Sequence, residues 1–93
     1  MTPLLLSLVL MRPPGSVHYV ALHWTASTTF GVRYRVYKSQ HTGGPYYRAA
    51  GGILATSYSD YAVMQHHSYF YVVRAVKDGV ESVDSNEAEA TVK

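Results

Sequence analysis

The chain has 93 residues, of which 47% are hydrophobic and 13% aromatic, so it can form one domain with one modest core. It contains no cysteine, which excludes a disulfide framework and any cysteine-ligated metal site. The formal net charge of +2 is too small to indicate nucleic-acid binding on electrostatic grounds. Charge asymmetry between the middle and the end of the chain is typical of a solvated surface, although it could also steer self-association. The charged residues concerned are Arg33, Arg35, Lys38 and Arg48 in the middle, and Glu81, Asp84, Glu87 and Glu89 near the end.

The first 15 residues form an apolar segment that includes the run PLLLSLVLM. This run is far too short to span a bilayer, which needs about 20 apolar residues. It lacks the basic region that begins a signal peptide, so a signal remnant is the less favoured alternative. We therefore expect residues 1–15 to supply a first strand or an assembly strand, ahead of a domain over residues 16–93. Its leucines are candidate interface residues: Leu4, Leu5, Leu6, Leu8 and Leu10.

The rest of the chain has a hydrophobic period of two, which is typical of β-strands. Runs around residues 16–27, 32–39 and 68–76 each place alternate side chains on one face. Turn-forming sequences separate the runs, among them Asp78-Gly79, a dipeptide favoured in tight hairpins that need positive φ. Several short strands at this spacing, without helical periodicity, predict an all-β sandwich. The inward-facing residues are Leu22, Trp24, Tyr34, Val36, Tyr69, Tyr71, Val73 and Ala75.

The succession VALHWTAS, YRVYKS, GGPYYR, TSYSDYAV and SYFYVVRAVKDGVESVDSNEAEATV resembles a fibronectin type III domain of the kind common in bacterial extracellular proteins. The resemblance covers residues 16–93 and implies an immunoglobulin-like β-sandwich of about seven antiparallel strands. It implies that Trp24 is the buried tryptophan of the second strand. The step from Val63 to Tyr69 implies that both pack in the core, and that Tyr69 is a tyrosine-corner residue whose hydroxyl bonds back to the upstream chain.

Two features depart from the family pattern. His66 stands three residues before the corner tyrosine, where the family usually has glycine. Either the backbone avoids positive φ at His66 or the turn is strained. The first strand, LLLSLVL, is also more apolar than the polar, proline-containing strand of the family, and more apolar than an edge strand requires.

Aromatic and apolar side chains gather on the outward face of the predicted sheet. Phe70 and Val72 lie beside Arg74 on one strand, and the neighbouring strand adds Tyr37. A patch of this kind often marks an interface, although cross-strand pairing alone can account for outward aromatics. With the leucine-rich segment added, we favour an interface. The candidate interface residues on this face are Tyr37, Tyr46, Tyr47, Phe70 and Val72.

The sequence offers little for catalysis or metal binding. The carboxylates fall mostly in turns, and Asp60 is expected to bond nearby backbone groups. His66 and His67 are adjacent, so on a strand they would point to opposite faces and would not bind one ion. We predict no enzymatic activity, no metal and no cofactor.

Two functional hypotheses follow. In the first, the chain is a non-catalytic extracellular structural or adhesive module that self-associates into an oligomer, filament or surface layer through the apolar strand and the aromatic face. In the alternative, it is a spacer or accessory module of a larger extracellular enzyme or adhesin, binding another protein or a polysaccharide. Neither involves nucleic acid or a membrane span. The extracellular or cell-surface location is implied by the family resemblance.

Overall fold

The computed structural model describes the backbone of residues 6–11 and all atoms of residues 18–93. Leu4 and Leu5 lie outside the described residues. In the described ranges no helix is long and apolar enough to cross a membrane. The strands there are β1 (Leu6–Met11), β2 (Tyr19–Trp24), β3 (Arg33–Ser39), β4 (Tyr47–Ile53), β5 (Ser57–Asp60), β6 (Ser68–Lys77), β7 (Val80–Glu81) and β8 (Ala88–Thr91).

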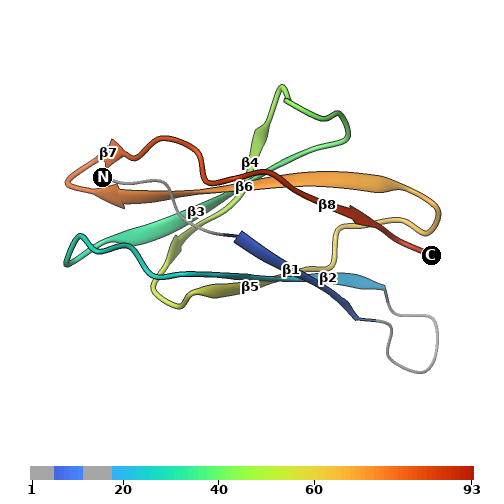
Figure 1. The fold of residues 1–93 in the computed structure, drawn as a ribbon, viewed down its shortest axis with the longest axis horizontal. Helices are drawn as coiled ribbons and strands as arrows, with labels where there is room; N and C mark the ends of the chain where they lie inside the picture. The colour runs from blue at the N-terminus through green and yellow to red at the C-terminus, as the bar shows by residue number, and fades with distance from the viewer. Residues whose placement is uncertain (1–5, 12–17) are drawn as a thin grey trace.

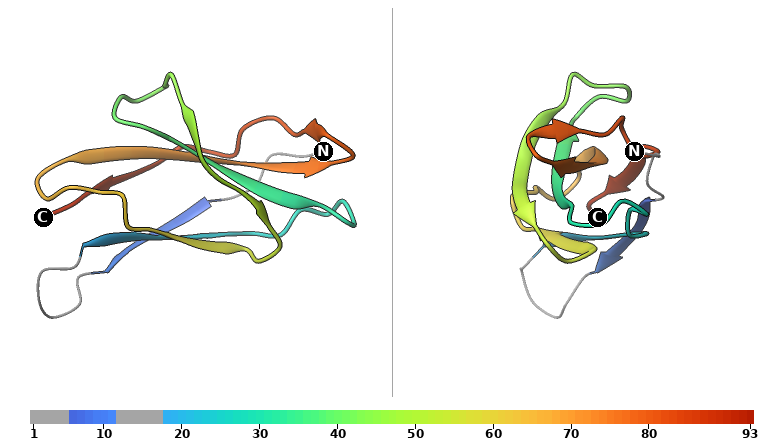
Figure 2. Two further views of the ribbon diagram at one scale, coloured as in Figure 1. Left: turned by 180° about the vertical axis from the view of Figure 1, so that it is seen from behind. Right: turned by 90° about the vertical axis from the view of Figure 1, so that its left-hand side faces the viewer.

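The strands form two antiparallel sheets that face each other as layers (Figures 1 and 2). One sheet has the order β1-β2-β5, and the other has the order β4-β3-β6-β7, with β8 also paired to β6. β7 pairs with the end of β6 and β8 with its beginning, so together they act as one interrupted last strand. The predicted all-β, immunoglobulin-like sandwich is confirmed.

The core fills the space between the sheets because alternate side chains of β2, β3 and β6 point inward. The Trp24 ring packs edge-on against the Tyr34 ring, with 5.4 Å between centroids. Val63, which was expected in the core, is half-buried and packs against its margin. The buried residues predicted for this cluster are Leu22, Trp24, Tyr34, Val36, Tyr69, Tyr71, Val73 and Ala75; Val20, Ala90 and Val92 join them.

Two turns use the left-handed backbone region. Asp78 and Gly79 adopt φ of 51° and 77°, and they connect β6 to β7 as the predicted tight hairpin. His66 adopts φ of 69°, so of the two outcomes expected there the structure has positive φ. Nearby, the Tyr69 hydroxyl accepts a 2.8 Å hydrogen bond from the Met64 amide, which is the geometry of a tyrosine corner.

The leucine-rich β1 is an edge strand of the sandwich. Its backbone pairs with β2 along its whole length, with Leu6 opposite Trp24 and Met11 opposite Tyr19. Positions 6, 8 and 10 therefore lie opposite the core residues of β2. One edge of the β1 backbone is therefore already paired within the molecule.

Candidate functional site

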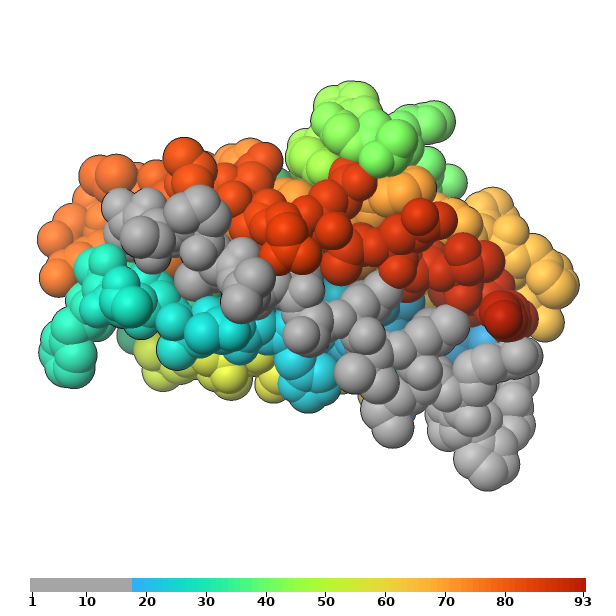
Figure 3. Space-filling view, in the orientation of Figure 1, coloured from blue at the N-terminus to red at the C-terminus, as the bar shows by residue number. Residues whose placement is uncertain are grey.

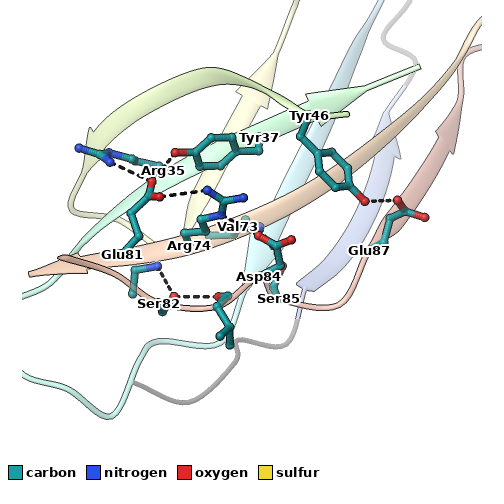
Figure 4. Close-up of polar contacts among 12 residues, drawn as sticks. Arg35, Tyr37, Tyr46, Val73, Arg74, Glu81, Ser82, Asp84, Ser85 and Glu87 are labelled. Atoms are coloured by element: carbon teal, nitrogen blue, oxygen red, sulfur yellow. Dashed lines mark hydrogen bonds and ion pairs between the residues drawn. The ribbon is translucent and has the colours of Figure 1, made fainter. Parts of the chain in front are cut away.

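The outer face of the β4-β3-β6-β7 sheet carries an ion-pair network centred on Glu81 of β7 (Figure 4). Glu81 accepts a 2.8 Å hydrogen bond from Arg35, a 2.9 Å hydrogen bond from Arg74 and a further one from the Tyr37 hydroxyl. Arg74 also donates to Asp84 at 2.6 Å, and its guanidinium lies 4.1 Å from the Tyr37 ring centroid. One carboxylate thus links three strands.

These donors change the titration of the carboxylate. Hydrogen bonds from Tyr37 and then Arg35 lower the pKa of Glu81 to about 2. The charges that the sequence suggested for steering self-association, such as Arg35 and Glu81, are therefore paired within one chain.

The predicted aromatic patch on this face is smaller than expected. Val72 is only 2% exposed and belongs to the buried residues, so its assignment to an exposed interface was wrong. It lies directly opposite Tyr37 and between Phe70 and Arg74 on the same face, so its neighbours there are all larger side chains. Phe70 and Tyr37 are themselves half-buried.

Tyr46 and Tyr47 have different environments although they are adjacent. The Tyr46 hydroxyl donates to Glu87, which also accepts from Thr42 at 2.7 Å and from the Gly43 amide at 2.8 Å (Figure 4). Glu87 thereby fastens the β3–β4 loop, which stands out from the molecule in Figure 3, to the segment before β8. Burial and this carboxylate raise the pKa of Tyr46 to about 12. Tyr47, at the start of β4, is 54% exposed.

A buried ion pair joins the two sheets. Lys38 of β3 lies 2.8 Å from Asp60 of β5, and the two side chains are 2% and 3% exposed. Lys38 also donates to the Ala62 carbonyl at 2.5 Å, and its ammonium lies 4.6 Å from the Tyr69 ring centroid. Asp60 accepts from the Tyr71 hydroxyl at 2.7 Å and from the Ala62 amide at 3.0 Å, the latter being the backbone bond expected from the sequence. Each buried charge is thus satisfied by several partners.

Two serines supply side-chain acceptors where the last strand is interrupted, and their amides donate to the Ala75 and Val73 carbonyls. The Ser82 hydroxyl accepts from the Ala75 amide at 2.9 Å, and the Ser85 hydroxyl accepts from the Val73 amide at 2.8 Å. These contacts hold residues 82–85 against β6 between β7 and β8 (Figure 4). The sequence reasoning missed their role, which depends on the register of β6.

The outer face of the β1-β2-β5 sheet is chemically different. Tyr19 of β2 and Tyr61, just after β5, place their rings 5.0 Å apart with planes tilted by 30°. Tyr61 is 62% exposed, whereas Tyr19 is half-buried. The sequence reasoning put Tyr19 on the outward face but did not single it out, because its pairing with Tyr61 follows from the register between β2 and β5.

Among residues 18–93, no group of three histidine, aspartate or glutamate side chains is placed to hold a metal ion. Glu81, Glu87 and Asp60 each accept several hydrogen bonds from the chain itself.

No protein-family model matches the chain. The structure is similar to a crystal structure of an Fn3-like protein from Clostridium thermocellum, with a TM-score of 0.78 and 35% sequence identity. That match covers 94% of this chain and 88% of the other. The chain belongs to the fibronectin type III family.

Two other proteins contain a similar unit within a longer chain. The amylopullulanase of Thermoanaerobacter thermohydrosulfuricus is 39% identical over 72 residues, which span 76% of this chain but 5% of that enzyme. A pectate lyase of Erwinia chrysanthemi in complex with tetragalacturonic acid has a TM-score of 0.74 at 21% identity, covering 95% of this chain and 28% of the lyase. The lyase shares the fold. This fibronectin type III domain thus spans a small part of the amylopullulanase that it matches.

Proposed function

We propose that this fibronectin type III domain is a non-catalytic accessory module of a larger extracellular enzyme that acts on polysaccharide. The observation that carries the proposal is the 39% identity to a segment that makes up 5% of an amylopullulanase. Because the matching segment is so small a part of the amylopullulanase, we assign the domain a positioning or binding role rather than a catalytic one.

The self-association hypothesis has weaker support. It relied on an unusually apolar first strand, an aromatic outer face and complementary charge. In this chain β1 pairs with β2, Val72 is buried, and Arg35 and Arg74 pair with Glu81 of the same molecule. These features favour the accessory-module alternative.

The arrangement of acidic groups supports a non-catalytic role. A general acid–base pair needs two carboxyl groups that face one cleft. Asp60 is enclosed between the sheets with Lys38, whereas Glu81 lies on an outer face with Arg35 and Arg74. These two carboxylates are each paired with a cation and do not face one cleft.

An immunoblot of the organism that carries the gene tests this proposal. Antibodies raised against the 93-residue chain should detect, in the secreted fraction, a polypeptide much larger than 10.3 kDa. The same fraction should cleave a polysaccharide, whereas the purified 93-residue chain should not. A secreted or cellular species of about the mass of the chain itself would contradict the proposal.

A further inference from the structure

The two outer faces of the sandwich differ sharply in charge. The face of β3, β6 and β7 carries Arg35, Arg74 and Glu81 in close ion pairs. On the face of β2 and β5, by contrast, none of the described outward side chains is an aspartate, glutamate, lysine or arginine. Those outward residues are Tyr19, Ala21, His23, Ser57, Ser59 and Tyr61.

The register explains why these six side chains share one surface. Val20 lies opposite Asp60, and the residues that alternate with them point away from the core. Tyr19 therefore meets Tyr61 across the strands, Ala21 meets Ser59, and the next outward pair, His23 and Ser57, continues the row. Ala21 is only 6% exposed. The accessible side chains of the row are therefore His23, Ser57, Ser59 and Tyr61, with Tyr19 half-buried.

The tyrosine pair has the properties of a stacking platform. The half-buried Tyr19 ring lies 5.0 Å from the Tyr61 ring and supports it, while Tyr61 keeps 62% of its surface exposed. Tyrosine offers a large, stiff contact surface at low conformational-entropy cost. Hydroxyl and imidazole groups along the row can exchange hydrogen bonds with hydroxyl groups of a ligand.

We propose that the outward face of β2 and β5, centred on the Tyr19–Tyr61 pair, binds a neutral glucan chain. An aromatic ring packs against the C–H face of a sugar, and uncharged donors and acceptors match sugar hydroxyls. The absence of Lys and Arg from the described side chains of this face argues against an anionic polysaccharide, which needs charge partners. The inference rests on the proposed function, because it names the ligand of the accessory module.

Calorimetric titration of the 93-residue chain with pullulan, a neutral glucan, tests the site. Pullulan should bind, and Tyr61→Ala should weaken the affinity by about tenfold, the effect of losing one aromatic contact. Tyr61→Phe, which keeps the ring, should retain binding. Tyr47→Ala is the matched control, because Tyr47 is also exposed but lies on the other sheet; it should bind as the unchanged chain does. Thermal melting of each variant checks that the fold is retained.

Several outcomes would overturn the inference. The first is that the unchanged chain fails to bind pullulan, and the second is that Tyr61→Ala binds it as tightly as the unchanged chain does. The third is that Tyr47→Ala loses as much affinity as Tyr61→Ala. The last is that polygalacturonate binds as strongly as pullulan at physiological salt. Such results would leave a large secreted polypeptide on the immunoblot unaffected, so the module would then act as a spacer. A polypeptide of about the mass of the 93-residue chain on the immunoblot would instead contradict the proposed function, whatever the result of the titration.

Discussion

Lys38 and Asp60 form an ion pair that links the two sheets. Their charged atoms are 2.8 Å apart and almost entirely enclosed, and each has further partners within the chain. Desolvation of such a pair is costly, so its net contribution to stability is small compared with the cost of removing one member.

We expect Lys38→Met to lower the free energy of unfolding by about 3–5 kcal/mol, because it leaves the Asp60 carboxylate buried without its counter-ion. Urea unfolding followed by tryptophan fluorescence measures the change, since Trp24 lies in the core. The double variant Lys38→Met/Asp60→Asn should lose less stability than the sum of the two single variants. Strict additivity of the two losses would show that the pair is not coupled.

His66 lowers the stability of the fold, because its backbone conformation is unfavourable for a residue with a side chain. Left-handed φ costs a non-glycine residue roughly 1 kcal/mol, although histidine tolerates it better than most. His66→Gly should therefore raise the free energy of unfolding by about 0.5–1 kcal/mol. Gln65→Gly, next to it and outside the positive-φ residues, should lower stability slightly. A loss of stability in His66→Gly would refute this explanation.

At the scale of elements, Glu81 controls how β7 is held against β3 and β6. Its pKa in the fold is about 2, below the ordinary value of 4.5, so its contribution to stability is complete above pH 4.5. That contribution is lost as the pH falls from 4.5 towards 2, because protonation removes the acceptor of Arg35 and Arg74.

The prediction is that Glu81→Gln is less stable than the unchanged chain at neutral pH and that the difference shrinks between pH 4.5 and pH 2. Urea unfolding at a series of pH values measures it. Glu89→Gln, which removes an exposed carboxylate of β8, is the control and should leave the stability at neutral pH nearly unchanged. A difference that stays constant down to pH 2 would rule out the depressed pKa as its source.

The interrupted last strand depends on Ser85. Replacement by alanine leaves the Val73 amide, in the centre of β6, without its acceptor. Ser85→Ala should cost about 1–3 kcal/mol of unfolding free energy. Hydrogen exchange measured by NMR should show faster exchange at the Val73 amide than in the unchanged chain. The exposed Ser57→Ala should change neither quantity.

The elements also show what the sequence could and could not predict. Alternation along β2, β3 and β6 was enough to assign the inward residues, because a strand has a period of two. The same alternation places Lys38 on the inward face after Tyr34 and Val36, so the buried lysine had a signal in the sequence that its charge obscured. The partners of Glu81 had no such signal, since they depend on the register of strands distant in the chain. Val72 was misassigned for the same reason, because alternation indicates which face a residue is on but not what surrounds it.

For the whole molecule, the fold and the family follow from agreement between local pattern, turn residues and the similarity to a solved Fn3-like protein. The proposed function rests on the similarity to a segment of an amylopullulanase and on the surface of the domain. One sheet presents a face of paired charges. On the other sheet, the described outward side chains of β2 and β5 include no Asp, Glu, Lys or Arg, and two tyrosine rings lie together there. This difference between the faces fits a module that binds a ligand on one side better than a subunit that assembles with copies of itself.

Light scattering after size exclusion distinguishes a binding module from a self-assembling subunit. We expect the 93-residue chain to be a monomer of about 10.3 kDa whose mass does not change with protein concentration. A mass that rises with concentration, or elongated particles of many chains, would contradict the account and restore the self-assembling subunit.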